Sequence, residues 1–467
     1  MGCRKFLTAA LVLSACLIFC YPVFAQTQNV KVGGSLDAYW FYRSDFDLSH
    51  DHGGMFQGGI SDDTKTNRTN GDDFFMSIAQ LNVAADLTDQ VSAKINVINQ
   101  RDWNASVYDP ELPGDVSTAA TAFDVNLDEA YIEMKGIFYE PLTLKIGRQD
   151  IALGREFIIA SNQTDPVGTM SAEEFSVFEA FDAVRATLDF DPWTVDLIYS
   201  KMDEGNINNE DDIDLYTAYL THKFSDYNAV ADLYWIGYWD RSLVNVLPGK
   251  RSSDTESVGG RVQLDPIPQM TLGAEAAYQF GHYEFTSTAK KDRDAWGLDL
   301  FATYRFENQW KPDLTAEYVR FSGESDLSDD NSSYGSWNFL CRGPTYGWIH
   351  EYLEQFYTTA QEGDQPAGQN LQSLFLTLNL NPAADLRLSG TYYWYWAVDD
   401  IHLVTADPSS PKLGDFIGQE IDTKLTYTYT EDVQFGIEAD WFVPGSLYQA
   451  PNNKTASQLI TSVSVSY

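Results

Sequence analysis

The sequence is built from runs in which apolar and polar residues alternate, and the connections between these runs switch between short and long. In one run Leu374, Leu376 and Leu378 alternate with Phe375 and Thr377. A period of two places one set of side chains on each face of a β-strand. After residue 30 we find no convincing run at helical spacing, so we expect strands throughout, each with one apolar and one polar face.

The alternating runs predict eighteen strands, with sixteen as the alternative count. Short connections such as 88–90 and 381–384 alternate with long, polar ones such as 154–176 and 322–370. The predicted strands begin near residues 30, 74, 91, 125, 142, 178, 193, 214, 228, 256, 269, 295, 313, 371, 386, 419, 433 and 457.

Sorting short turns to one end and long loops to the other is typical of a closed antiparallel barrel in the outer membrane. A soluble sandwich has no reason to sort its loops in this way. We therefore predict an all-β fold, a transmembrane antiparallel β-barrel with long extracellular loops and short periplasmic turns. The even strand count places both termini on the periplasmic side.

Composition removes several other classes. Hydrophobic residues make up 44% of the chain and aromatic residues 14%, which disordered chains do not approach. The 68 acidic residues against 30 basic ones give a net charge of −38, which repels nucleic acid. Beyond the N-terminus no segment approaches the roughly 18–20 apolar residues of a membrane-spanning helix.

The N-terminus predicts export. Arg4 and Lys5 precede an apolar stretch over 6–20, and small residues before position 25 fit a signal peptide cleaved after Ala25. A lipoprotein box at Leu13–Cys16 is the alternative. We predict a signal peptide over 1–25 and a single barrel domain over 26–467. Cleavage removes two basic residues and no acidic one, so the net charge becomes −40.

Two further signals agree with a barrel. Trp and Tyr gather near the predicted strand ends, as at Trp193, Trp239 and 392–396, where aromatic girdles meet lipid headgroups. The last alternating run ends on Tyr467, an aromatic terminus similar to the signal read by the barrel-insertion machinery of Gram-negative bacteria.

Three segments resemble the alginate-export family of outer-membrane porins. The family carries Gly-Arg-Gln at the end of one strand and Phe-Asp-Gly-Val-Arg at the start of the next. In this chain Ala183 stands at the glycine position of the second motif. The resemblance implies an eighteen-stranded channel; its exporter passes a polyanion through a basic lumen, whereas this chain is strongly acidic. The matching segments are Asp128 to Gly136, Leu144 to Gly154 and Phe181 to Phe190.

Polar-face residues of so wide a barrel line water rather than a packed core. Rows of bases and acids at a constriction orient solutes and set charge preference, whereas the alternative is that they neutralise one another and hold the sheet. Arg148 has the wrong parity and needs a bulge to point inward. The residues assigned to the pore are Arg148, Arg185, Lys94, Lys145, Lys223, Arg261, Arg305, Arg387, Glu275, Asp299 and Glu317.

The long connections suggest two further features. The acidic stretch 326–331 is a weak match to a calcium loop, so we predict no cofactor and keep calcium in the acidic loops as the alternative. The connection 322–370 is long and apolar, and we predict that it folds into or over the pore with a short helix over 348–357.

The sequence offers few candidate residues for catalytic or metal chemistry. His50 and His52 flank an aspartate in a Gly-rich loop, and Cys341 has no evident neighbouring base. The catalytic and phosphate-binding motifs that we sought are missing from the sequence. We predict that the protein is not an enzyme.

The sequence therefore predicts an outer-membrane channel for diffusion or export of a polar solute: a saccharide, a polysaccharide or an organic anion. The alternative is a binding or adhesion barrel with a plugged pore and cation-binding acidic loops, and a barrel enzyme ranks third. The predicted partners are outer-membrane lipid and lipopolysaccharide, the barrel-insertion machinery and the solute, with no nucleic acid.

Overall fold

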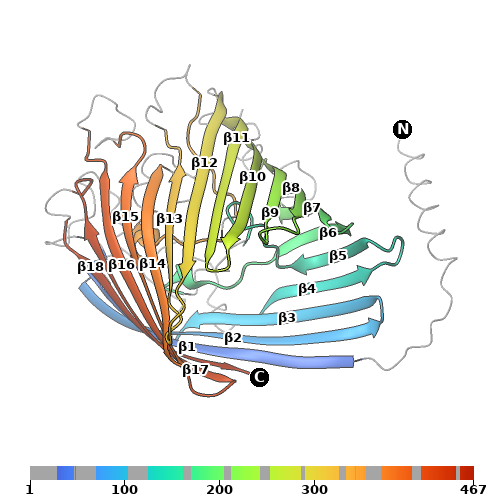
Figure 1. Cartoon of the computed structure of the whole chain (residues 1–467), viewed down its shortest axis with the longest axis horizontal. Helices are drawn as coiled ribbons and strands as arrows, with labels where there is room; N and C mark the ends of the chain where they lie inside the picture. The colour runs from blue at the N-terminus through green and yellow to red at the C-terminus, as the bar shows by residue number, and fades with distance from the viewer. Residues whose placement is uncertain are drawn as a thin grey trace, which may run out of the picture.

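The computed structural model describes the barrel and the loop segments that lie against it (Figure 1). The predicted signal peptide, the helix residues after 353, His50, His52 and the stretch 326–331 lie outside the described residues. The described ranges are 29–46, 48, 70–103, 125–160, 170–204, 212–241, 253–284, 290–324, 333–341, 343–353, 370–401, 412–448 and 453–467.

All eighteen predicted strands are present in the described part of the chain. They are β1 (Asn29–Ser44), β2 (Asn70–Thr88), β3 (Val91–Asp102), β4 (Asn126–Lys135), β5 (Leu142–Gln149), β6 (Phe181–Asp189), β7 (Trp193–Asp203), β8 (Ile213–Lys223), β9 (Val230–Asp240), β10 (Ser253–Ile267), β11 (Met270–Glu284), β12 (Lys290–Arg305), β13 (Asp313–Phe321), β14 (Leu371–Ala383), β15 (Leu386–Ala397), β16 (Phe416–Thr428), β17 (Val433–Pro444) and β18 (Ala456–Ser466).

Each strand pairs antiparallel with its neighbours in chain order, and β1 pairs with β18 to close the sheet. At this seam Gly34 and Tyr467 exchange two backbone hydrogen bonds of 3.1 Å each. A Cβ on Gly34 would lie 2.6 Å from the Gln80 backbone carbonyl oxygen and 2.6 Å from the Tyr467 hydroxyl, so this close approach favours glycine. Closure leaves no strand edge facing lipid, as a membrane barrel requires.

The connections follow the predicted short and long alternation with one exception. On the long-loop side, β11 and β12 are joined by 285–289 alone, which is shorter than the 306–312 turn that follows at the opposite end. The expectation of a strict alternation was therefore wrong at this point. A short connection can also occur on the loop side, because an antiparallel pair of strands needs only a turn long enough to join them.

The two faces of the sheet differ as the alternation predicted. Leu374 and Leu376 are exposed on the outside, at 39% and 38%, whereas Phe375 between them is 8% exposed. On β11, Tyr278 is exposed and Glu275 is buried. The apolar parity therefore faces outward, where lipid replaces water, and the polar parity faces the interior.

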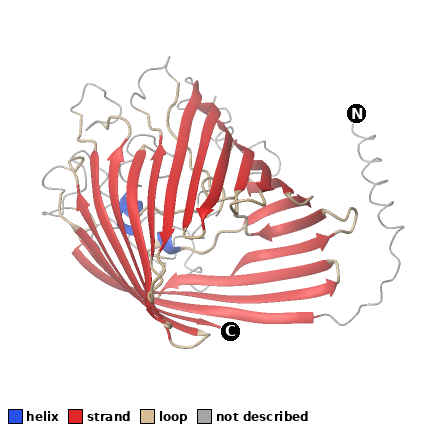
Figure 2. Ribbon diagram, in the orientation of Figure 1, coloured by secondary structure: helices blue, strands red, loops and turns tan. Residues whose placement is uncertain are grey.

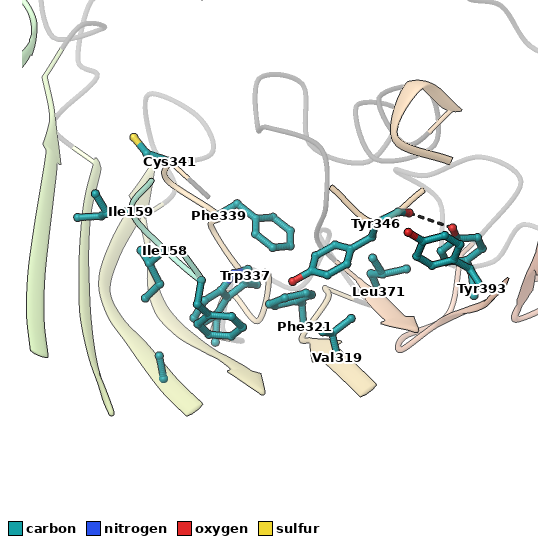
Figure 3. Close-up of a cluster of buried hydrophobic side chains, with 14 of the residues drawn as sticks. Ile158, Ile159, Val319, Phe321, Trp337, Phe339, Cys341, Tyr346, Leu371 and Tyr393 are labelled. Atoms are coloured by element: carbon teal, nitrogen blue, oxygen red, sulfur yellow. Dashed lines mark hydrogen bonds between the residues drawn. The ribbon is translucent and has the colours of Figure 1, made fainter. Parts of the chain in front are cut away.

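Two connections pack against the inner wall at the loop end of the barrel. In the β5–β6 connection Ile158 and Ile159 are buried, and in the β13–β14 connection Trp337 and Phe339 are buried with them (Figure 3). These side chains form one apolar cluster with inward-facing residues such as Phe321. Each fully buried ring or aliphatic side chain contributes about 1.5–3 kcal/mol, which holds the connections to the wall.

The two connections also contact one another. Ile159 and Cys341 form a parallel bridge, and the Cys341 amide donates to the Ile158 carbonyl at 3.1 Å. Helical structure is confined to η3 (Glu173–Phe175) and 348–353 among the described residues, and Figure 2 shows both stretches within the curve of the sheet. No helix in the described ranges is long and apolar enough to cross a membrane.

Candidate functional site: the charged inner wall

A row of charged side chains crosses the inner wall from β9 to β12. In register, Arg261 on β10 lies opposite Asp232 on β9 and Glu275 on β11, and Glu275 lies opposite Asp299 on β12. The Arg261 Nε donates to Asp232 at 2.6 Å. Asp232, Glu275 and Asp299 are at most 3% exposed. The pairing register therefore sets acids and a base in one belt, with the acids in excess.

A loop residue completes this belt. Arg155, from the β5–β6 connection, donates through Nη2 to Glu317 at 2.8 Å and lies 3.5 Å from Asp299 through Nε. Its guanidinium also lies over the Phe301 ring, 3.5 Å from the centroid. A charge-assisted bond and a cation–π contact together fix one rotamer of a long side chain. Arg155 therefore links an inward connection to β12 and β13.

Gly154 explains how the chain reaches this position. Its φ is +62°, in the left-handed region, and a Cβ here would lie 2.4 Å from the Tyr219 hydroxyl on β8. Glycine is the residue that adopts this conformation at no steric cost. The backbone can therefore lie directly against the wall, and the next side chain, Arg155, extends toward Asp299 and Glu317.

Another part of the wall, from β2 to β7, pairs its bases with acids of the same strands. Lys94 on β3 binds Glu129 on β4. Lys145 on β5 lies 3.8 Å from Glu133 on β4, directly opposite it in register. The corresponding pair farther along the wall is Arg185 on β6 with Asp196 on β7, at 2.8 Å.

A bulge in β4 alters the local alternation. The register of β3 with β4 shifts after Asn96, so that Asp128 is the extra residue and both Asp128 and Glu129 are buried on the inside. The Asn96 amide nitrogen donates to Asp128 at 2.7 Å. A bulge turns a side chain toward the other face of the sheet, and this bulge places two consecutive carboxylates on the inner face.

A polar cavity of about 210 Å³ adjoins this bulge. It lies between the inner wall and the β5–β6 connection. Three strand amides, one lysine and four carboxylates provide most of its lining: Gln80, Asn82, Asn96, Lys94, Asp128, Glu129, Asp150 and Glu179, with Val177.

A third acidic group lies on β16 and β17. Asp422 is opposite Asp440 in register, and Lys424 lies 2.9 Å from Glu438. The amides of Ile349 and His350, at the start of the 348–353 helix, each donate to the Glu420 carboxylate at 2.8 Å. A carboxylate at this end binds the free amides of the helix and complements its dipole.

Three predicted pore bases lie at the short-turn ends of their strands. Lys223, Arg305 and Arg387 are exposed there, and they share the inward parity of their strands. Arg305 donates to Thr271 at 3.0 Å and Arg387 to Asn379 at 3.4 Å. These bases are near the periplasmic end of the barrel and not in the buried belt.

Arg148 lies in β5 without the register shift that the sequence analysis required. The register of β5 with β4 and β6 continues unshifted through Arg148, which lies opposite Ala130 and Asp182. This is the parity on which Val184 is exposed at the outer face. Its guanidinium lies 3.4 Å from Asp182 and over the Phe178 ring. Its place among the pore residues stays a prediction.

Sequence reasoning missed several interior bases in the described part of the chain, among them Arg155, Arg43, Lys291 and Arg293. Arg155 lies in a connection, where strand parity gives no information, and only the glycine before it was a usable signal. Arg43 on β1 has the inward parity, and its Nε donates to Gln458 at 2.7 Å while it also binds Glu174. The alternation around Arg43 could have identified it.

Other candidate chemistries find little support. Burial raises the pKa of the Cys341 thiol to about 12, so the thiolate needed for a nucleophile is scarce at neutral pH. Among the described residues no group of three or more His, Cys, Asp or Glu side chains is placed to hold a metal ion.

A closed sheet with an apolar outer face and a charged inner wall defines an outer-membrane β-barrel of the channel type. A sequence profile described as "Alginate export" matches residues 47–462. The chain belongs to this family and is an outer-membrane channel for polar solutes.

Solved structures with the same fold include proteins of Pseudomonas aeruginosa and Acinetobacter baumannii. OpdO of Pseudomonas aeruginosa aligns with a TM-score of 0.54 at 11% identity, covering 94% of this chain and 97% of its own. OccAB2 of Acinetobacter baumannii aligns with a TM-score of 0.54 at 11% identity, covering 94% and 98%. OccK11 (OpdR) of Pseudomonas aeruginosa aligns with a TM-score of 0.53 at 10% identity, covering 94% and 95%. The search of curated proteins gave no match.

Proposed function

We propose that the chain is a passive channel in which polar solutes diffuse through the barrel without a chemical step, and that neutral and positively charged solutes pass more readily than anions. The observation that supports this is the excess of carboxylates on the inner wall. In the β9–β13 belt, two guanidinium groups face four carboxylates, those of Asp232, Glu275, Asp299 and Glu317.

The β16–β17 part of the wall has the same imbalance. Lys424 is the base paired there, and the carboxylates around it are Glu420, Asp422, Glu438 and Asp440. Fixed charges along a narrow lumen raise the local concentration of the opposite ion and set charge preference. Among the predicted solute classes, a neutral saccharide therefore fits this wall better than a polyanion such as alginate or an organic anion.

Recording in planar bilayers tests the proposal directly. The full chain, refolded in detergent, is added to one side of a membrane under a salt gradient, and the reversal potential is measured. We expect discrete conductance steps and a reversal potential on the cation side. A reversal potential on the anion side contradicts the charge preference. A barrel shown to be inserted but without steps contradicts the channel.

A plugged binding barrel is the second candidate, and one observation favours it. The β5–β6 and β13–β14 connections pair at Ile159 and Cys341 and share one buried apolar cluster inside the sheet. If the same recordings give no conductance, this reading replaces the first.

Two partners are proposed along with the channel. The exposed apolar parity contacts membrane lipid, and the long-loop side is proposed to lie against lipopolysaccharide. The β18 strand and its terminal Tyr467 are proposed to be read by the barrel-insertion machinery. Deletion of Tyr467 should lower the yield of barrel in the outer membrane, and a full yield would contradict that role.

A further inference from the structure

We propose that the cavity beside the β4 bulge binds a small, hydroxylated solute that carries an ammonium group. This inference rests on the proposed function and names a class of solute for one place along its route. The cavity lies between β2, β3, β4 and the β5–β6 connection, and described residues form its lining.

The bulge gives the cavity its charge. In a regular strand Asp128 and Glu129 would point to opposite faces, whereas the shifted register buries both on the inside at 5% and 4% exposure. Asp150, just after β5, and Glu179, just before β6, add carboxylates from the connection. Four carboxylates therefore surround a space in which Lys94 is the base of the lining.

Polar atoms of the wall are left with capacity to bind. Asp128 accepts from Asn96 through Oδ2, while Asp128 Oδ1 and Asn96 Oδ1 are buried and have no hydrogen-bond partner among the described residues. A buried acceptor without a partner is unfavourable, and a bound donor removes that penalty. An ammonium group offers three donors and no acceptor, and it matches this set.

The size of the cavity favours an organic solute over a bare ion. At about 30 Å³ of liquid volume per water, a cavity of 210 Å³ holds about seven waters. No cluster of metal-ligand side chains is placed to chelate an ion in the described ranges. The amides of Gln80 and Asn82 can donate to and accept from hydroxyl groups, so the site suits an ammonium on a hydroxylated skeleton.

An anion does not fit the same space. The Lys94 ammonium is already bound to Glu129, and an incoming carboxylate would face Asp128, Asp150 and Glu179. Like charges in a partly desolvated site repel more strongly than in water. The same Lys94–Glu129 contact shows that the site accommodates one ammonium on its wall.

Three hexoses that differ mainly in charge test the proposal. Glucosamine, glucose and glucuronate are titrated calorimetrically into the full chain in detergent, at a pH where the amine is protonated. We expect glucosamine to bind about tenfold to hundredfold more tightly than glucose, as for hydrogen bonds to charged groups, and glucuronate to bind most weakly. Equal affinities, or tightest binding of glucuronate, overturn the proposal.

Variants locate the binding. Asp128→Asn keeps the shape and removes one charge, and Asp150→Asn does the same at an exposed position that is not part of the sheet. Each should lower the glucosamine affinity about tenfold, whereas Asp226→Asn, in the exposed β8–β9 turn, should leave it unchanged. Heat-modifiable migration on gels confirms that each barrel is folded.

The two proposals fail in different ways. If a folded barrel conducts but Asp128→Asn and Asp150→Asn bind glucosamine as the parent does, the cavity is not the site and the channel stands. If glucosamine binding needs both carboxylates while the bilayer stays silent, the site stands and the channel fails.

Discussion

The β9–β13 belt and the β2–β4 wall carry similar groups but fill their space differently. In the belt, the Arg155 guanidinium reaches across from a connection and contacts both Asp299 and Glu317. In the β2–β4 wall, Lys94 binds one carboxylate and a cavity remains beside Asp128. The same chemistry therefore gives a closed contact in one place and an open one in the other.

The difference shows which part of the sequence controls which property. Strand register fixes the charges that face inward, because each residue has a defined partner on the neighbouring strand. The connections then decide whether those charges are covered. Gly154 allows the chain to lie against β8, whereas beside the β4 bulge the base among the described lining residues is Lys94, which comes from a strand.

Removing the loop base should have the largest effect. Arg155→Ala leaves Asp299 and Glu317 without their shared cation, so we expect about 1–3 kcal/mol of lost stability, since the side chain is partly exposed. The lumen also becomes more negative, and cation selectivity should rise. Denaturant unfolding and reversal potentials measure the two effects. Arg305→Ala, at an exposed strand end, is the control.

Gly154→Val should lower the stability of the barrel as Arg155→Ala does, but it should change the ion selectivity less. A β-branched residue strains a backbone with φ of +62°, and its Cβ would collide with the Tyr219 hydroxyl. We expect a loss of about 1–3 kcal/mol as the connection moves off the wall. Unfolding with and without Tyr219→Phe separates strain from collision; an unchanged midpoint would be evidence against the close approach.

Removing the base from the β2–β4 wall should strengthen the binding of a cationic solute there. Lys94→Met removes the ammonium from Glu129 and leaves that carboxylate free for a solute. We expect the glucosamine affinity to rise severalfold, the opposite sign to Asp128→Asn. A fall in affinity would show that Lys94 holds the cavity open. The same titration of glucose controls for a change in shape.

The smallest expected effect is on the rate at which the Cys341 thiol is labelled. With its pKa raised to about 12 by burial, the thiol should react with maleimide only as the pH approaches that value. Below it the group stays protonated. In Arg155→Ala, separation of the two connections would return the pKa toward about 8.5 and allow labelling in mildly alkaline buffer. Equal rates in both proteins would show that the connections stay paired.

The fold could be predicted from the sequence because the alternation of apolar and polar residues along a barrel strand shows which face is outside and which is inside. Glu275 and Tyr278 alternate as the faces do, and every predicted strand exists in the described chain. Arg185, Arg261 and Lys94 were placed inward by the same parity. Two features escaped it: the bulge that turns Asp128 inward, and Arg155, whose position depends on tertiary contacts of a connection.

The bridge between Ile159 and Cys341 has a consequence for the order of assembly. These residues are far apart in the sequence, and each belongs to a connection anchored by its own pair of strands. Contacts of such long range form late, because chain entropy opposes them until local pairing is complete. Hairpins should therefore pair first, and the interior should take its final shape only after the strands on both sides have been inserted.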